Sequence, residues 1–390
     1  MKILVVHNSY QQAGGEDNVV AAEVSLLTKY DNEVELWSVD NKDLPNGLIG
    51  KIGTALNTNY SPAARAIARE KLRNFQPDVV HVHNFFPQIS PSIYDACLDE
   101  GIPVVQTLHN YRLICPGAML MRDGNICEQC VSRSPYQAAW YACYRGSRLG
   151  SLVVAHMVAQ HRNRGTWQDK VTRFIALTEF AKSKFIAAGF PADKIAIKAN
   201  FLHDPFLNSS LTISPPLSSE FALFVGRISK EKGIKVLMDA WIALSEKNML
   251  KVAGSGPLES LLLGRNNVEA LGRQTTAEVS ALMRKATFLV LPSQWYEGFP
   301  LVLVEAFAHG LPVLASRLGS MADIIKDGET GLLFEPGNAE DLAEKAKFLL
   351  ENPLQARQLG ANARRIFLEK YTAEQNYAEL MAIYTDACAA

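Results

Sequence analysis

One segment in the second half of the chain, EGFPLVLVE, combines two carboxylates with a proline at a spacing suited to phosphate and sugar chemistry. Pro300 suits the first turn of a helix, which leaves Glu297 in the preceding loop and puts Glu305 about one and a half turns into the helix. The amides around Phe299 and Leu301 then lie at a helix N-terminus, which favours a phosphate. Glu305 could bind both hydroxyls of a ribose, and Glu297 could hold sugar hydroxyls. Two glutamates on a helix surface remain the alternative.

A second segment, FVGRISKEKG, supplies two cations. Arg227 and Lys232 flank the turn that follows an apolar run at 221–225. Two cations there could neutralise a diphosphate and stabilise the charge that builds on it as a leaving group. A solvated basic turn would explain the same residues. Gly254 and Gly256, in a GSGP loop, are weaker evidence, because small residues before a helix are common.

The elements that must position these segments are strands alternating with helices. In the first half we expect a loop with Gly14 and Gly15 at 8–17, a helix at 18–30, and strands at 2–7, 33–39, 78–83, 103–108 and 173–177. In the second half we expect helices at 233–245, 257–263, 276–285 and 300–309, and strands at 221–225, 249–253, 268–271, 288–291 and 312–315. This alternation indicates parallel sheets with crossover helices, which is an α/β fold class.

The alternation lapses around 203–220, a polar stretch with several prolines and serines, and then restarts. The restart predicts two doubly wound domains, at 1–203 and 221–370, joined by a linker at 204–220. A last helix at 371–390 is expected to pack back on the first domain. Ligands bind beyond the carboxyl ends of strands in such sheets, so the loops of the two domains are expected to converge on a cleft.

Together, these segments resemble retaining glycosyltransferase family 4, or glycosyl transferases group 1, whose fold is called GT-B. The resemblance covers essentially the whole chain. The matching residues are Gly14-Gly15, Thr107-Leu108-His109, the run Gly226-Arg227 to Glu231-Lys232-Gly233, Gly254-Ser255-Gly256-Pro257, and the pair Glu297 and Glu305. It implies two Rossmann-like domains facing a central cleft, the first binding the acceptor and the second binding the nucleotide sugar.

The resemblance also implies roles for individual residues. Arg227 and Lys232 would bind the donor diphosphate, and Glu305 would bind the ribose. His109 would lie beside the transferred sugar. The remaining residues expected to contact the donor are Glu297, Gly226, Gly254, Gly298, Phe299, Pro300 and Leu301, with the Gly14-Gly15 loop closing near phosphate and acceptor.

The reaction implied is metal-independent transfer of a sugar from a UDP or GDP sugar to a glycan or lipid-linked acceptor, with no cofactor required. Front-face substitution would let the departing phosphate deprotonate the acceptor. Synthesis of lipopolysaccharide, capsule or exopolysaccharide fits this chemistry. Asn110 departs from the family pattern, since many relatives carry Asp there. A nucleotide-sugar epimerase, a phosphorylase with pyridoxal phosphate, and a non-catalytic nucleotide-sugar sensor of the same fold are alternatives.

Four cysteines fall close together in an insertion at about 112–145. Cys115, Cys127, Cys130 and Cys143 read C-x11-C-x2-C-x12-C. Four thiolates with one Cys-x-x-Cys pair could hold a structural zinc ion. Only one such pair is present, however, so free buried thiols remain an alternative.

A basic stretch follows, with seven Arg or Lys and one Asp between 133 and 173. Its arginines are mixed with aromatic residues such as Trp140 and Tyr141, a composition that can settle at anionic lipid headgroups. A domain helix with solvated arginines explains it equally well. No nucleic-acid partner is expected, because no reader motif accompanies the charge. The apolar runs at 2–7 and 149–159 are too short for a signal peptide or a membrane span, so we expect a cytoplasmic protein, at most attached to the inner face of the membrane.

Overall fold

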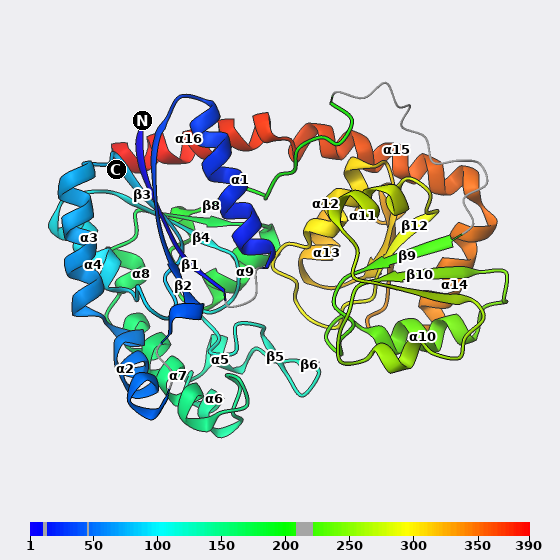
Figure 1. Ribbon diagram of the computed structural model, residues 1–390, viewed down its shortest axis with the longest axis horizontal. Helices are drawn as coiled ribbons and strands as arrows, with labels where there is room; N and C mark the ends of the chain where they lie inside the picture. Colours follow the sequence, from blue (N-terminus) through cyan, green and yellow to red (C-terminus); the bar gives the residue numbers. More distant parts are fainter. Residues whose placement is uncertain (11–13, 45–46, 208–220) are drawn as a thin grey trace. The chain divides into compact units, whose positions relative to one another are not determined.

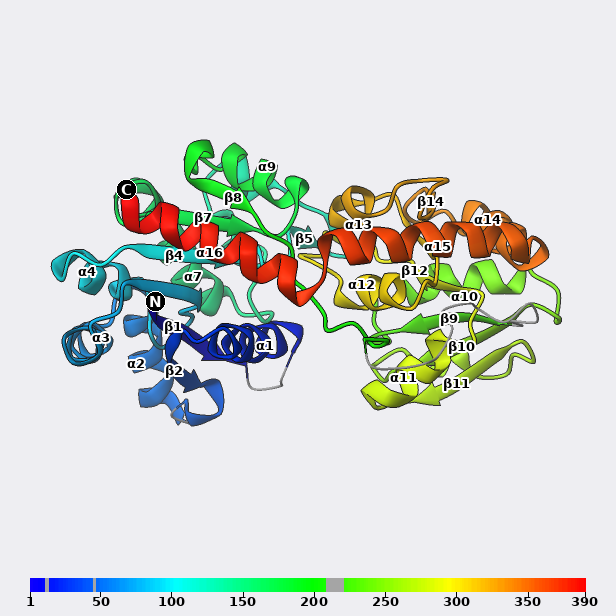
Figure 2. The ribbon, with the colours of Figure 1, turned by 90° about the horizontal axis from the view of Figure 1, so that it is seen from above.

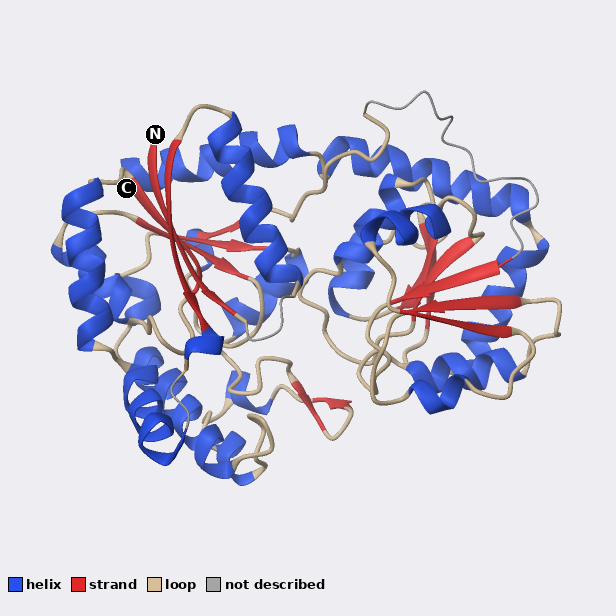
Figure 3. Ribbon diagram, viewed as in Figure 1, coloured by secondary structure: helices blue, strands red, loops and turns tan. Residues whose placement is uncertain are grey.

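The computed structural model describes residues 1–10, 14–44, 47–207 and 221–390, so most of the predicted linker at 204–220 and part of the loop at 8–17 lie outside the described residues. The described chain forms two compact units. The first contains residues 1–120, 127–200 and 376–390, and the second contains 121–126 and 201–375. Each unit is an α/β layer structure built on its own sheet (Figures 1 and 3).

The sheet of the first unit has six parallel strands in the order β2-β1-β3-β4-β7-β8. Its strands are β1 (Lys2–Ser9), β2 (Glu33–Asp40), β3 (Val79–Asn84), β4 (Val104–Leu108), β7 (Arg173–Ala176) and β8 (Ile195–Ile197). Strands β3 and β4 are buried throughout, as expected of strands covered on both faces. The strand order reverses between β1 and β3, which makes the ends of these two strands the place where a ligand is expected.

Helix α1 (Gly15–Lys29) and helix α16 (Ala373–Ala389) cover one face of this sheet. Val20 and Leu27 of α1 share a buried cluster with Leu380 and Tyr384 of α16 and with apolar residues of the central strands. In Figure 2, which is a view from above, α16 crosses in front of the strands of this sheet. The other helical segments are η1 (Asn41–Asp43), α2 (Gly47–Asn59), α3 (Pro62–Phe75), α4 (Ser92–Asp99), α5 (Gln129–Ser132), α6 (Gln137–Trp140), α7 (Arg148–Asn163), α8 (Thr166–Asp169), α9 (Glu179–Ala187) and η2 (Ala192–Lys194).

The sheet of the second unit also has six parallel strands, in the order β11-β10-β9-β12-β13-β14. They are β9 (Phe221–Val225), β10 (Met249–Ala253), β11 (Val268–Gly272), β12 (Phe288–Leu291), β13 (Val313–Ser316) and β14 (Gly331–Phe334). This order is the 3-2-1-4-5-6 arrangement of dinucleotide-binding folds, with its switch point between β9 and β12.

Helices cover both faces of this second sheet, with α10 (Ile234–Ile242) on one side and α11 (Thr276–Met283) and α12 (Leu301–Ala308) on the other (Figure 1). The remaining elements are η3 (Glu259–Leu262), α13 (Gly319–Ile324), α14 (Ala339–Glu351), α15 (Pro353–Lys370) and the hairpin β5 (Met121–Arg122) and β6 (Asn125–Ile126). The core beneath α10 and α14 is apolar, with Trp241 and Phe288 almost fully buried in it.

Most predicted elements are confirmed with bounds shifted by one to three residues, and three strands of the second unit match without any shift. The predicted helix at 257–263 is wrong, because the chain forms only a 3₁₀ turn, in which Glu259 accepts a bond from the Gly256 amide at 2.7 Å. Helix α1 begins three residues before its predicted start, because Asp17 accepts the Gly14 amide at 2.8 Å. Among the described helices, none has the length and apolar character needed to cross a membrane.

Candidate functional site

The first part of the candidate site lies in the second unit, at the switch point between β9 and β12. The loop after β9 carries Arg227 and Lys232, and the loop after β12 carries Glu297. Because parallel strands end at the same edge, these two loops are neighbours. The backbone joins them directly, since the Gln294 amide donates to the Glu231 carbonyl at 2.8 Å.

An ion pair links the two loops. Lys232 Nζ donates to Glu297 Oε1 at 2.7 Å, and Ser293 Oγ donates to the same oxygen at 2.6 Å. The ammonium also lies 5.7 Å from the ring centre of Trp295. Glu297 is buried and its carboxylate is held by these two bonds, whereas the Lys232 side chain is partly exposed. The structure therefore brings together two residues that the sequence placed 65 positions apart.

Arg227 is the exposed cation of the site. Its side chain is 62 % exposed and pairs with Glu231, four residues further along the same loop. Ser229 Oγ also donates to Glu231, at 2.7 Å. Burial tends to raise the pKa of Glu231, but the Ser229 bond and Arg227 outweigh burial and lower it. Arg227 thus has a guanidinium open to solvent and held by a single carboxylate, an arrangement that an anionic ligand can share.

Two glycines allow the backbone to approach this closely. A Cβ atom at Gly233 would lie 1.8 Å from the carbonyl oxygen of Pro292, and Gly233 has φ of +72°. A Cβ atom at Gly254 would lie 1.9 Å from the carbonyl oxygen of Gly226. Only glycine fits at such positions. Gly233 and Gly254 are therefore required by contacts between loop backbones.

Helix α12 begins one residue after its predicted start, with Pro300 as the cap and Leu301 as the first helical residue. The Leu303 amide bonds the Pro300 carbonyl at 2.9 Å, and amides in the first turn of a helix have no carbonyl of a preceding turn to bond. Glu305 lies in the second turn, and burial raises its pKa. The loop before the helix is fixed by Ser320 Oγ, which donates to the Gly298 carbonyl at 3.0 Å.

The second part of the candidate site lies in the first unit, around a surface pocket at the ends of β3 and β4. Its lining residues are His83, Asn84, Phe85, Phe86, Gln106, Thr107, Leu108, His109, Asn110, Arg112 and Leu113. His109 follows β4, the strand predicted at 103–108, and His83 and Asn84 are the last two residues of β3. His109 Nε2 lies 2.8 Å from His83 Nδ1.

Gly14 is the N-cap of α1, and Gly15 is the first residue of this helix. The acidic residue that follows them, Glu16, accepts bonds from the Tyr10 hydroxyl at 2.9 Å and from the Asn110 amide at 3.4 Å. Burial raises the pKa of Glu16 to about 8, and the bond from Tyr10 opposes this rise only in part. Glu16 is therefore largely protonated at neutral pH. Asn110 thus contacts both Tyr10 and Glu16, which precede and follow the Gly14-Gly15 pair in the chain.

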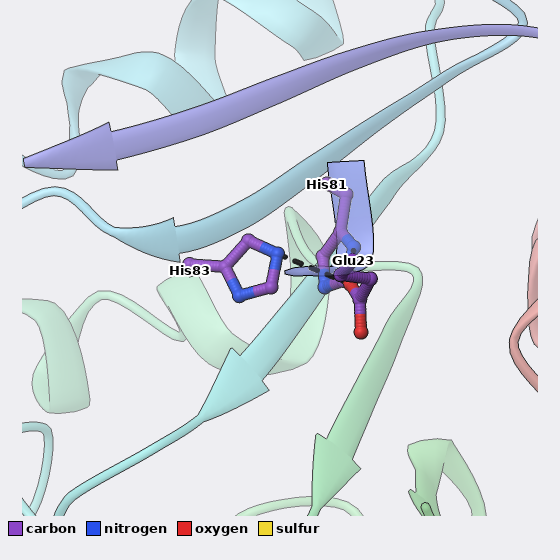
Figure 4. Close-up of side chains that lie close together, drawn as sticks. All are labelled: Glu23, His81 and His83. Atoms are coloured by element: carbon purple, nitrogen blue, oxygen red, sulfur yellow. Dashed lines mark ion pairs between the residues drawn. The ribbon is translucent and has the colours of Figure 1, made fainter. Parts of the chain in front are cut away.

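Sequence reasoning missed a buried polar cluster behind the pocket. Glu23 of α1 meets His81 and His83 of β3, with Glu23 Oε1 3.1 Å from His81 Nδ1 and 3.2 Å from His83 Nε2 (Figure 4). Lys198 Nζ donates to Glu23 Oε2 at 3.0 Å. Two signals were present in the sequence: a His-x-His pair, which puts both imidazoles on one face of a strand, and an acidic residue on the apolar face of a helix.

The four cysteines of the insertion all lie in the first unit and are not joined by disulfide bonds; Cys115 and Cys130 are buried, and Cys127 and Cys143 are half-buried. Burial raises the pKa of the Cys130 thiol to about 12, and the other three thiols add to this rise, so all four are neighbours. Among the described residues, however, the group whose metal-binding atoms lie within 4.8 Å of one another is Glu23, His81 and His83. The zinc site stays a prediction that this thiol geometry does not support.

Comparisons with known proteins agree with the fold. Residues 213–366 match the family model "Glycosyl transferases group 1", and residues 13–202 match "Glycosyltransferase Family 4". The uncharacterized glycosyltransferase MJ1607 of Methanocaldococcus jannaschii is 30 % identical over 79 % of this chain and 75 % of its own length. The phosphatidyl-myo-inositol mannosyltransferase of Mycobacterium leprae is 29 % identical over 85 % of this chain and 79 % of its own length.

The chain spans less than half the length of some other curated relatives, such as MJ1178 of Methanocaldococcus jannaschii, which is 38 % identical over 43 % of this chain and 48 % of its own length. Among solved structures, Anabaena HepE in complex with UDP superposes with a TM-score of 0.69 over 99 % of this chain and 100 % of HepE, at 18 % identity. The fold is therefore GT-B, as predicted. The chain belongs to the glycosyltransferase family of group 1 and family 4 enzymes.

Proposed function

We propose that this protein is a retaining glycosyltransferase that moves a sugar from a nucleotide diphosphate to a glycan or lipid-linked acceptor in cell-surface polysaccharide synthesis. The observation that carries the proposal is the ion pair between Lys232 and Glu297 at the switch point of the second unit. It sets a cation and a buried carboxylate beside the exposed Arg227 and the N-terminus of α12. Phosphate, sugar hydroxyls and ribose each find a matching group there.

The proposed donor site works as follows. Arg227 and Lys232 take the charge of the diphosphate, both in the bound donor and as the leaving group develops, which makes a metal ion unnecessary. The first-turn amides of α12 add backbone donors to the same phosphates. Glu305 accepts hydrogen bonds from the ribose hydroxyls, and Glu297 from the sugar. Without donor, Glu297 neutralises Lys232, so the ammonium is already placed when the diphosphate arrives.

The proposed acceptor side is the pocket of the first unit, with His109 beside the transferred sugar. Front-face substitution lets the departing phosphate take the acceptor proton, which leaves no role for a nucleophilic side chain. A transferase consumes donor only when acceptor is present, whereas an epimerase converts the donor alone and a sensor does neither. Product analysis with and without acceptor therefore separates these classes.

Donor binding is tested first by thermal unfolding with UDP, GDP, ADP and CMP in the presence of a chelator. Anabaena HepE was solved with UDP, and UDP is therefore the first ligand of the series. A ligand at 100 times its Kd stabilises the folded state by about 2.7 kcal/mol, which is roughly 5–10 °C for a unit of this size. Arg227→Ala should weaken binding by roughly 10- to 100-fold, because a charged hydrogen bond contributes about 1.5–3 kcal/mol. Glu305→Ala should remove the ribose contact.

Arg365→Ala is the matched control for Arg227→Ala. Arg365 is 54 % exposed and pairs with Glu369 four residues away, as Arg227 pairs with Glu231, but it lies on α15. The control should bind nucleotide like the wild type. If no nucleotide raises the unfolding temperature, or if the control loses binding as Arg227→Ala does, the donor site is assigned incorrectly.

We also propose that the first unit contacts an anionic membrane at the cytoplasmic face through the residues around α6 and α7. Trp140 is 75 % and Leu149 is 77 % exposed. Arg145 and Arg148 are exposed beside them, and the Arg148 guanidinium lies 6.0 Å from the Trp140 ring. Exposed aromatic and aliphatic side chains among arginines complement an anionic headgroup layer.

Vesicle co-sedimentation tests this membrane proposal with phosphatidylglycerol and phosphatidylcholine vesicles. We expect binding to the anionic vesicles only, and weaker binding at high salt. Leu149→Asp should reduce it, while Leu263→Asp in the second unit, where Leu263 is 74 % exposed, should not. Equal loss in both variants, or no binding by the wild type, would refute the proposal and leave α7 as a helix with solvated arginines.

A further inference from the structure

The buried cluster behind the acceptor pocket has no role in the donor chemistry described above. Glu23 is 2 %, His81 0 % and His83 3 % exposed, and of these three residues His83 alone also lines the pocket. Figure 4 shows the imidazoles of His81 and His83, which occupy alternate positions of β3, beside the carboxylate of Glu23. A buried carboxylate with two imidazoles is expensive to desolvate, and the question is what it does for the pocket.

A metal ion is the first candidate occupant, because these three side chains have donor atoms within 4.8 Å of one another. The surroundings argue against it. The Lys198 ammonium lies 3.0 Å from Glu23 Oε2 and already neutralises the carboxylate. His81 is bonded on both sides, to the Tyr384 hydroxyl through Nδ1 and to Thr107 Oγ1 through Nε2, each at 2.7 Å. A divalent cation would have to displace these bonds and sit beside a buried ammonium.

The protons of the cluster can be assigned from its contacts. Lys198 holds Glu23 ionised, and although burial opposes this, the pKa of Glu23 lies well below its ordinary value. A carboxylate has no proton to donate, so the imidazole nitrogens that face it carry protons. For His83 this nitrogen is Nε2, which lies 3.2 Å from Glu23 Oε1. The two atoms are not aligned as a hydrogen bond, and the negative charge of the carboxylate is what favours the proton on this ring nitrogen.

The position of the proton on His83 also determines the hydrogen bond between His83 Nδ1 and His109. Burial lowers the pKa of His83 to about 3, so the ring carries a single proton at neutral pH. With that proton on Nε2, Nδ1 has a lone pair, and His109 Nε2 at 2.8 Å must supply the N–H of the bond between them. Burial also lowers the pKa of His109 well below its ordinary value, so its Nδ1 is bare.

We propose that Glu23 acts through His83 as a positioning group for His109, fixing the tautomer in which His109 Nε2 carries the proton and Nδ1 offers a lone pair. His109 lines the pocket, so its Nδ1 accepts a hydrogen bond from a hydroxyl of the sugar bound there. The tautomer itself follows from the contacts alone, whereas its use in sugar binding rests on the proposed function. His81 stabilises Glu23 but has no bond to His109 among the described contacts.

The direct test is ¹⁵N NMR of histidine side chains in the full-length wild-type protein, whose eight histidines give a resolvable spectrum. Protonated and bare ring nitrogens differ widely in shift. We expect Nε2 of both His83 and His109 to carry protons, with a coupling through the hydrogen bond between His109 Nε2 and His83 Nδ1. A proton on His83 Nδ1 overturns the proposal. So does displacement of the protons on His81 and His83 by one equivalent of ZnCl₂, which would make the cluster a metal site.

Variants separate positioning from stability. His83→Phe removes the acceptor of His109 and should leave its two tautomers in exchange, while His81→Phe removes the other imidazole facing Glu23 and should leave the His109 spectrum unchanged. In the transferase assay His83→Phe should lower kcat by roughly 10- to 100-fold, by analogy with the loss of a hydrogen-bond partner of a metal-bound histidine, with little change in donor KM. Equal effects of both variants on His109 overturn the proposal. The spectra decide even if no transfer activity is found, so failure of the proposed function remains distinguishable.

Discussion

Replacing Lys198 with methionine should destabilise the first unit far more than the loss of an ordinary lysine does. The side chains of Lys198 and Glu23 are 2 % and 3 % exposed, and Lys198 also donates to Asn376 Oδ1 at 3.3 Å. Lys198→Met leaves Glu23 as a buried, uncompensated carboxylate. Breaking such a pair from one side costs about 3–5 kcal/mol. At roughly 2–4 °C per kcal/mol for a unit of this size, the first unit should unfold about 6–20 °C lower.

The destabilisation should also depend on pH in a defined direction. In the wild type the pKa of Glu23 is held well below its ordinary value, so Glu23 contributes stability above its unfolded pKa that is lost as the pH falls through its folded pKa. In Lys198→Met the remaining charge is unfavourable, and Glu23 gains a proton as the pH falls. The difference in the free energy of unfolding between the wild type and Lys198→Met should therefore become smaller as the pH falls from 8 to 5.

Hydrogen exchange read by mass spectrometry follows each unit separately, since peptides of β1 and β3 report on the first unit. Glu23→Gln combined with Lys198→Met removes both charges and should recover part of the loss, with a coupling of about 0.5–3 kcal/mol. Lys184→Met is the control, because Lys184 pairs with Glu128 at 2.6 Å where the side chains are 19 % and 36 % exposed. It should cost at most about 1 kcal/mol. The reasoning would be refuted if Lys198→Met lost no more free energy of unfolding than this control, or if the double variant were no more stable than Lys198→Met.

Three further predictions concern the glycines, the glycine-loop carboxyl and the cysteines. Gly233→Ala should destabilise the second unit by about 2–5 kcal/mol, because the new Cβ atom would overlap backbone atoms at a residue with positive φ. Gly272→Ala should cost only about 1–2 kcal/mol, because Gly272 also has a positive φ, +67°, but has open space around its Cβ position. Urea unfolding of both variants measures the two free energies. Because the pKa of Glu16 is raised to about 8 in the folded state, the free energy of unfolding should fall as the pH rises from the pKa of Glu16 in the unfolded chain to pH 8. Glu16→Gln should make the free energy of unfolding less dependent on pH, which unfolding curves measured across this range would show. If the zinc prediction holds, elemental analysis of protein purified without chelator should find one zinc ion per chain, lost in Cys127→Ser with Cys130→Ser; substoichiometric zinc would contradict it.

Much of the second unit could be predicted from the sequence because its signals are local. Apolar runs correctly predicted the strands, and Pro300 predicted the start of α12 to within one residue. The glycines of the loops after β9 and β10 were correctly placed at strand ends. The segment after Gly256 was mistaken for a helix because its apolar spacing fits either a helix or a 3₁₀ turn, and a side-chain bond to the Gly256 amide decides between them.

The buried cluster of the first unit could not be predicted in the same way. Its members come from α1, β3, the segment after β8 and α16, and Tyr384 lies 303 positions from His81. Each residue alone looks like a polar side chain in an apolar pattern. Only the fold brings their charges together, and only the resulting distances assign the protons. Loop-end motifs can be read from one stretch of chain, whereas a network with long separations requires the three-dimensional contacts.

The docking of α16 on the first unit has a consequence for synthesis on the ribosome. Leu380, Tyr384 and Ala387 complete a core whose other members all precede residue 201. At about 5–20 residues per second, translating the second unit in between takes roughly 10–40 s. During that interval the nascent first unit has an uncovered apolar face and lacks the hydroxyl partner of His81. We expect it to be a chaperone client until α16 emerges, and a premature stop in the second unit to disable both units at once.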